Sequence, residues 1–268
     1  MPLTIDACAA QHQGDRKEQQ DRVAILPHAK KRGVALVVVA DGMGGHTGGA
    51  LAAEQVLHTA RTNLENFVPA EESPRLMLEN SMREAHTMIK ASRFINEKDP
   101  HSTAVMLLLQ PGKVAWAHCG DSRLYCFRGD QLRQRTVDHS YVEHLVANGR
   151  ITAAQALTHP NRNVLLTSLG GQDEPIFGFA EVEDIAGGDS FMLCSDGLWA
   201  YFDEAELGRI VAENSARTAC EILIDQARLR AKGAGDNVSL AIIKLIEVAA
   251  PKAKPRPPAG FVPKITYN

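Results

Sequence analysis

The sequence predicts an α+β fold built on mainly antiparallel sheets. Short apolar runs follow one another across tight turns, as strands of a meander do. Helical patterns come in pairs instead of alternating with single strands, which disfavours a βαβ repeat. The chain has 268 residues, 44% of them hydrophobic, enough for one domain core. We therefore expect one domain over residues 1–248.

Six runs are predicted to be strands, because each is short, apolar and rich in β-branched or aromatic residues. The turn at residues 110–112 should pair the second run with the third, and the fourth should return beside the third. In chain order the runs are 34–40, 103–109, 114–119, 124–127, 190–194 and 238–248.

Helices are predicted between these runs. Residues 48–66 carry apolar side chains at the i, i+3, i+4, i+7 spacing of one buried stripe. A second helix should begin after Ser73 as N-cap and extend to about residue 94. Asp203 and Glu206 predict a capping box, and residues 215–232 predict a last helix.

Two segments fall outside this pattern. Residues 140–169 contain short helical pieces and are expected to form a flap over one sheet edge. Residues 249–268 are rich in Pro and Lys and predict an extended or disordered tail, with a partner-docking segment as the alternative.

Composition excludes several partners. The net charge of −3 and the dispersed Lys and Arg residues do not form the basic patch that nucleic acid binding requires. The strongest apolar run is far shorter than the roughly 18–20 residues that cross a bilayer. Five cysteines without a C-x-x-C pair indicate free thiols, and hence a cytoplasmic location.

Aspartates stand at the ends of the predicted strands: Asp41, Asp121 and Asp196 follow strands, and Asp236 precedes one. If neighbouring strands share an end, these carboxylates converge. Such a cluster needs raised pKa values or bound cations. Ligation by oxygen alone favours Mg²⁺ or Mn²⁺, and Gly42 could offer its carbonyl. Taken singly, an Asp-Gly after a strand is most often a turn.

The glycine-rich loop 42–49 also suggests a dinucleotide fingerprint. That motif requires a strand after the helix at 48–66, where a second helix is predicted instead. Asp41 would repel a pyrophosphate, and no G-K-[ST] follows to make a P-loop.

Seven short motifs in order resemble the bacterial form of the PP2C-type, or PPM, family of metal-dependent protein serine/threonine phosphatases. They are residues 16–21 (RKEQQD), 41–45 (DGMGG), 102–104 (STA), 120–123 (GDSR), 138–140 (DHS), 195–197 (SDG) and 236–237 (DN).

The resemblance implies a four-layer α-β-β-α sandwich of two antiparallel sheets flanked by helix pairs. It implies hydrolysis of phosphoserine and phosphothreonine by a metal-bridging hydroxide, without a phosphoenzyme. Two Mn²⁺ or Mg²⁺ ions and a third, weaker ion are implied, and also phosphoprotein partners made by a Ser/Thr kinase. A monomer is expected.

Residue by residue, the resemblance implies that Asp41 bridges two ions. Asp196 and Asp236 would bind one of these ions, and the Gly42 carbonyl would bind the other. The remaining implied roles are a third ion on Asp121, metal-bound water on Asp21, substrate phosphate on Arg16, and support of Asp236 by Asn237.

The chain departs from the family at Gln20, where Glu is usual, so the second ion could bind more weakly. Met43 replaces a histidine used by some members, which leaves water as the proton donor, with His46 as an alternative. A silent regulatory module and a small-molecule phosphohydrolase remain alternative functions.

Overall fold

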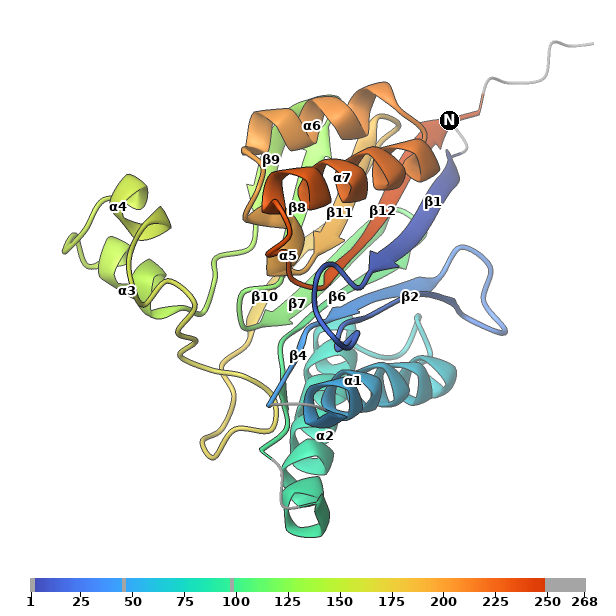
Figure 1. The fold of residues 1–268 in the computed structure, drawn as a ribbon. Helices are drawn as coiled ribbons and strands as arrows, with labels where there is room; N and C mark the ends of the chain where they lie inside the picture. The colour runs from blue at the N-terminus through green and yellow to red at the C-terminus, as the bar shows by residue number, and fades with distance from the viewer. Residues whose placement is uncertain (1–2, 45–46, 97–98, 249–268) are drawn as a thin grey trace, which may run out of the picture.

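Two five-stranded antiparallel sheets pack face to face in the computed structural model, which describes residues 3–44, 47–96 and 99–248 (Figure 1). The first sheet has the order β1-β12-β11-β8-β9. Its strands are β1 (Leu3–His12), β12 (Val238–Glu247), β11 (Asp189–Cys194), β8 (Arg123–Arg128) and β9 (Gln131–Arg135).

The second sheet has the order β10-β7-β6-β3-β2, and a two-stranded ribbon joins its end. The strands of the sheet are β10 (Gly178–Val182), β7 (Lys113–Cys119), β6 (Ala104–Gln110), β3 (Ala35–Ala40) and β2 (Arg22–Pro27); the ribbon pairs β4 (Gly42–Met43) with β5 (His101–Ser102).

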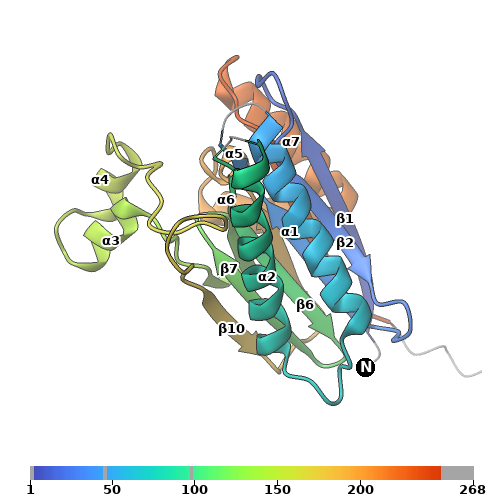
Figure 2. The ribbon, with the colours of Figure 1, turned by 90° about the horizontal axis from the view of Figure 1, so that it is seen from below.

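Helices cover the outer face of each sheet, so the sandwich has four layers. Figure 2 shows α1 (Thr47–Asn66) and α2 (Pro74–Asn96) side by side over the second sheet. The first sheet is covered by α6 (Glu204–Glu213) and α7 (Ala216–Ala231), preceded by the short α5 (Asp196–Trp199). This arrangement confirms the predicted fold class.

Strand β3 shows why these runs are almost wholly apolar. Val37 and Val39 face the other sheet, whereas Leu36, Val38 and Ala40 face α1 and α2. All five side chains have no exposed surface. A strand that is buried on both faces gains from apolar residues at every position, so strict alternation disappears.

The predicted helices and strands agree with the structure to within a few residues, but one predicted pairing is wrong. Strand β8 does not return beside β7; after the turn at Gly120, which adopts a positive φ, the chain crosses to the first sheet, where β8 pairs with β11 and β9.

Six strands of the structure are missing from the prediction. Two of them, β4 and β5, have only two residues each, and the other four, β1, β2, β9 and β10, lie at sheet edges. The clearest case is β1, which alternates partly buried and exposed residues and carries small side chains such as Ala7 and Ala9. Edge strands present only a weak apolar signal, because one side of each faces water.

The predicted capping box forms only in part. Asp203 accepts a hydrogen bond from the Glu206 amide at 2.7 Å. The Glu206 carboxylate binds the guanidinium of Arg230 instead of the backbone of Asp203. A cation from α7 is a stronger partner for that carboxylate than a backbone amide.

Residues 136–169 leave the sandwich and carry α3 (Tyr141–Ala147) and α4 (Ala153–Leu157) to one side of it (Figure 1). The expected tail, 249–268, lies outside the described residues. Within the described part of the chain, no helix is long and apolar enough to cross a bilayer.

Candidate active site

A pocket of about 610 Å³ opens beside the ends of β3, β11 and β12. Four of the aspartates singled out in the sequence contribute to its wall, and they come from four separate segments. The lining comprises Asp15, Arg16, Lys17, Glu18, Gln20, Asp41, Gly42, Met43, Gly44, Asp121, Asn163, Leu165, Asp196, Asp236 and Asn237.

Asp41 is held in place by the segment that begins β6. The hydroxyl of Ser102 donates to the Asp41 carbonyl at 3.1 Å, and the Thr103 amide donates to the same carbonyl at 2.9 Å. The Asp41 amide donates in turn to the Thr103 hydroxyl at 3.2 Å. The Asp41 backbone is therefore fixed on both sides of its side chain.

Gly42 lies where two backbones approach each other closely. A Cβ at this position would overlap the Gly49 carbonyl in α1 and lie 2.7 Å from the Gln20 carbonyl. Only glycine fits here, and the approach brings the start of α1 against β4 beside Asp41.

Asp196 begins α5, directly after β11. Its Oδ1 is buried and has no hydrogen-bond partner among the described residues. Gly197, the next residue, packs so tightly that a Cβ would overlap the Asn237 carbonyl. This close approach fixes α5 against the turn before β12. The unpartnered carboxylate oxygen of Asp196 costs free energy unless a cation or proton compensates.

Asp21 lies behind the pocket wall and is buried. Its Oδ2 accepts a hydrogen bond from the Ser195 hydroxyl at 2.8 Å. Ser195 also accepts a hydrogen bond from the Ser239 amide at 3.1 Å. Asp21 is thus tied to the end of β11 and the start of β12.

Arg16 lies on a loop that is clamped to the turn before β12. The Asn237 side chain accepts from the Gln20 amide at 2.7 Å and donates to the carbonyls of Gln13 and Glu18. Asn237 therefore anchors the loop that carries Arg16, and its backbone amide donates to Asp236 Oδ1 at 2.8 Å.

The guanidinium of Arg16 pairs with Asp236 Oδ2 at 2.5 Å. The Arg16 side chain is 61% exposed and that of Asp236 is 39% exposed. An ion pair this open contributes little stability, so both groups are free to exchange partners.

Asp121 stands at the far side of the pocket. The indole of Trp199 donates to its backbone carbonyl at 3.0 Å, and its side chain is buried. Gly120 before it adopts a left-handed conformation against Thr103, the residue that also holds Asp41.

Burial and mutual repulsion raise the pKa values of these carboxyl groups. Desolvation is the largest cause in each case, followed for most of them by the neighbouring carboxylates. It raises the pKa of Asp21 to about 7, of Asp121 to about 8 and of Asp196 to about 6. The pKa of Asp41 lies well above its usual range, although its side chain keeps some surface open to the pocket.

The donor set fits a hard divalent cation. All the converging ligands are oxygens, and one of them is buried without a partner. In the described part of the chain, no three His, Cys, Asp or Glu side chains are grouped so that they could hold an ion as they stand. The guanidinium of Arg16 occupies one carboxylate oxygen of Asp236.

The structure brings all the candidate residues to one place: Asp21, Asp41, Asp121, Asp196, Asp236, Arg16, Gly42, Gln20 and Asn237. No role is predicted from the sequence for Ser195 or Thr103, although both fall inside the motifs that resemble the family. A polar residue at the end of an apolar strand, beside an aspartate, is the signal that could have indicated their supporting contacts.

Comparisons with known proteins agree with this architecture. The model of the protein phosphatase 2C family matches residues 8–232. The serine/threonine phosphatase stp of Listeria innocua is 31% identical over 241 residues, covering 85% of this chain and 91% of that protein. Protein phosphatase PhpP of Streptococcus pneumoniae is 28% identical over 240 residues, covering 87% and 94%.

Solved structures share the fold. A serine/threonine phosphatase of S. agalactiae has a TM-score of 0.82 at 25% identity, covering 91% of this chain and 100% of that one. The catalytic domain of PstP, solved in complex with two manganese ions, has a TM-score of 0.76 at 27% identity, covering 92% and 100%. The chain therefore belongs to the protein phosphatase 2C family, among its bacterial serine/threonine phosphatases.

Proposed function

We propose that this protein hydrolyses phosphoserine and phosphothreonine in other proteins with the help of two divalent ions, Mn²⁺ or Mg²⁺. The observation that carries the proposal is the convergence of carboxylates on one pocket, with a buried oxygen of Asp196 left unpartnered. The two manganese ions in the PstP structure support the metal requirement.

Asp41, Asp196, Asp236 and the Gly42 carbonyl would hold the two ions, with Asp41 between them. Divalent ions in such a site neutralise phosphoryl oxygens and lower the pKa of a coordinated water, so no phosphoenzyme is required. Asp121 would hold a third ion together with Asp196. Asp21, fixed by Ser195, would orient water around the metal site.

Arg16 would bind the substrate phosphate. It lies at the pocket wall, is largely exposed, and its present partner Asp236 is one of the proposed ligands. A guanidinium presents two parallel N–H groups to two phosphate oxygens. Asn237 would hold the Arg16 loop in register with Asp236, since its side chain binds the loop on both sides of Arg16 and its backbone amide donates to Asp236.

We also propose the partners and setting. Phosphoproteins would be the substrates, as the names of the relatives, serine/threonine phosphatase and protein phosphatase, suggest, and we expect a Ser/Thr kinase to produce them. Five free cysteines, four of them buried, favour a reducing cytoplasm, and a monomer suffices because one chain supplies the whole pocket.

Phosphate release from a phosphothreonine peptide tests this proposal. Metal-stripped protein should be inactive, and Mn²⁺ should restore turnover. Full activity in excess chelator would contradict the metal mechanism. Faster turnover of sugar or nucleotide phosphates than of the peptide would favour a small-molecule phosphohydrolase. Absence of Mn²⁺ binding at millimolar metal would favour a silent regulatory module.

The Gln20→Glu variant should bind Mn²⁺ more tightly. Gln20 lines the pocket, and a carboxylate there adds a negative charge near the ions. Even at the dielectric constant of water, about 80, a carboxylate about 6 Å from a divalent ion gains about 1.4 kcal/mol, which lowers the dissociation constant by about tenfold. Isothermal titration measures this, with Gln131→Glu on the exposed part of β9 as the control. Unchanged or weaker binding would show that position 20 does not limit metal affinity.

A further inference from the structure

We propose that Arg123 is a positioning residue that holds the flap at the edge of the active-site pocket and so sets the affinity for protein substrates. The inference rests on the proposed function. Arg123 is not part of the pocket wall, so it would act through the segment it binds.

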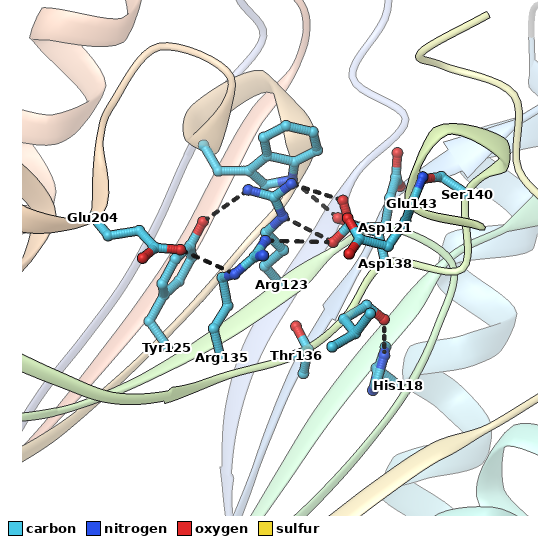
Figure 3. Close-up of polar contacts among 12 residues, drawn as sticks. His118, Asp121, Arg123, Tyr125, Arg135, Thr136, Asp138, Ser140, Glu143 and Glu204 are labelled. Atoms are coloured by element: carbon cyan, nitrogen blue, oxygen red, sulfur yellow. Dashed lines mark hydrogen bonds and ion pairs between the residues drawn. The ribbon is translucent and has the colours of Figure 1, made fainter. Parts of the chain in front are cut away.

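Arg123 is nearly enclosed by its neighbours (Figure 3). Its Nε and Nη2 donate to the two carboxylate oxygens of Asp138 at 2.8 and 2.7 Å. Its Nη1 donates to the Tyr125 hydroxyl at 3.2 Å, and its guanidinium lies 3.5 Å from the ring centre of Trp199. The side chain is 16% exposed and that of Asp138 is 6% exposed. A bidentate, stacked pair of this kind fixes the orientation of both partners.

Asp138 lies in the middle of the stem, which we define as residues 136–140, between β9 and α3. The Thr136 amide donates to the Leu124 carbonyl at 3.0 Å. The ring of His118 bonds to the Val137 carbonyl at 2.8 Å through Nε2, and the His139 amide donates to the Gly120 carbonyl at 2.9 Å. Asp138 supplies the one ion pair that ties the described stem to β8.

The stem in turn holds residues 164–166, where the chain returns from the flap through an isolated bridge between Ser140 and Leu165. The Tyr141 amide donates to the Val164 carbonyl, and the Leu166 amide donates to the His139 carbonyl, both at 2.8 Å. Leu165, between these two residues, lines the pocket, and so does Asn163. The path from Arg123 to the pocket edge therefore runs through Asp138, the stem backbone and residues 163–165.

The pocket edge formed by residues 163–165 would contact the substrate residues that flank the phosphorylated side chain. A small substrate such as p-nitrophenyl phosphate needs only the phosphate site, whereas a phosphopeptide must also pass the edge formed by residues 163–165. Displacing that edge should raise KM for a phosphopeptide more than KM for p-nitrophenyl phosphate.

Strand β8 offers a matched control at its other end. Arg128 makes the same bidentate contact with Asp189, through Nε at 2.6 Å and Nη2 at 3.0 Å. Asp189 is as well buried as Asp138, but its pair holds the turn before β11 and not the stem. Arg128→Lys therefore loses the same bidentate hydrogen bonding without touching the flap, from a side chain that is 46% exposed where that of Arg123 is 16% exposed.

The experiment compares Arg123→Lys with Arg128→Lys. Steady-state kinetics on a phosphothreonine peptide and on p-nitrophenyl phosphate are measured together with hydrogen exchange of the amides of residues 139–141 and 164–166. Arg123→Lys should raise KM for the peptide by about tenfold, the factor for one lost charge-assisted hydrogen bond. KM for p-nitrophenyl phosphate should change much less, and exchange should quicken only at the amides of residues 139–141 and 164–166.

The double variant Arg123→Met with Asp138→Leu covers the case in which the single variant unfolds. Apolar replacement of both partners of a buried ion pair often preserves stability, so this protein should fold and still show the raised peptide KM. Equal behaviour of the position-123 and position-128 variants in kinetics and exchange would overturn the inference. If wild-type protein releases no phosphate, the proposed function fails, and the exchange measurement alone decides the positioning role.

Discussion

Replacing Asp196 by Asn is expected to abolish Mn²⁺-dependent phosphate release, with a fall in kcat of about 10³-fold or more. Asp196 would hold one of the two proposed ions and share the third with Asp121, and it carries the buried, unpartnered oxygen. An amide oxygen is neutral and a weaker ligand, so the several kcal/mol of charge stabilisation that the metal supplies would be lost. Phosphopeptide turnover across a Mn²⁺ titration measures the effect.

Asp225→Asn on the exposed face of α7 is the control for this substitution, because it removes a carboxylate remote from the pocket. It should leave turnover unchanged. Retention of more than about a tenth of wild-type kcat by Asp196→Asn, at saturating Mn²⁺, would remove Asp196 from the proposed ligand set.

The Asp196→Asn variant should also be more stable against unfolding than the wild-type protein when metal is absent and the pH is high. Burial and Asp236 raise the pKa of Asp196 from about 3.8 to about 6. A group with a raised native pKa contributes stability that is present below its unfolded pKa and lost as pH rises through its folded pKa. Wild-type protein in chelator should therefore lose stability between about pH 4 and pH 6, whereas the amide of the Asp196→Asn variant cannot ionise.

Thermal unfolding of the metal-free wild-type protein and of the Asp196→Asn variant, at pH 4 and pH 8, tests the direction of this stability difference. The melting temperatures should be similar at pH 4, and the variant should melt higher at pH 8. Each kcal/mol of relieved repulsion corresponds to about 2–4 °C in a chain of this size. A lower melting temperature for the variant at pH 8 would mean that the charge of Asp196 is stabilised by partners within the protein.

Gly42→Ala is expected to reduce activity by about 100-fold or more and to destabilise the protein by about 1–3 kcal/mol. The added Cβ would overlap the Gly49 carbonyl and crowd the Gln20 carbonyl. Both neighbours are backbone atoms, so β4 or the start of α1 must move. Either movement displaces the Asp41 carboxylate and the Gly42 carbonyl from the proposed metal site.

Gly171→Ala is the matched control for Gly42→Ala. Its added Cβ would lie 3.3 Å from the Ser168 carbonyl, and its φ is not positive, so a small local adjustment accommodates it. Phosphopeptide kinetics and thermal melts of both variants give the comparison. Wild-type kcat in Gly42→Ala would show that the close approach of β4 and α1 is not needed to place Asp41.

Interior strands and long helices could be predicted from the sequence because buried segments are enriched in apolar residues. In β3, every position is apolar, since the strand is covered on both faces. The edge strands β1, β2, β9 and β10 could not be read with the same certainty, because half of their surface lacks a packing partner.

Some features of the candidate site could likewise be predicted from the sequence, and others could not. Aspartates at strand ends were visible as a pattern, and Asp41, Asp121, Asp196 and Asp236 do line one pocket. The Arg16–Asp236 pair joins residues 220 positions apart, and the link from Arg123 to the flap depends on the side chains of Asp138, Tyr125 and Trp199. Nothing in local sequence spacing encodes such contacts.

Residue types along the chain are enough to show which strands are interior, where carboxylates stand relative to them, and which family the motifs resemble. Which of those groups meet depends on how the whole chain packs. Burial between two sheets raises the pKa values of Asp21, Asp41, Asp121 and Asp196, and the clamp by Asn237 places Arg16 beside Asp236. Desolvation and long-range hydrogen bonds arise from packing in three dimensions, which is why the linear pattern could not specify them.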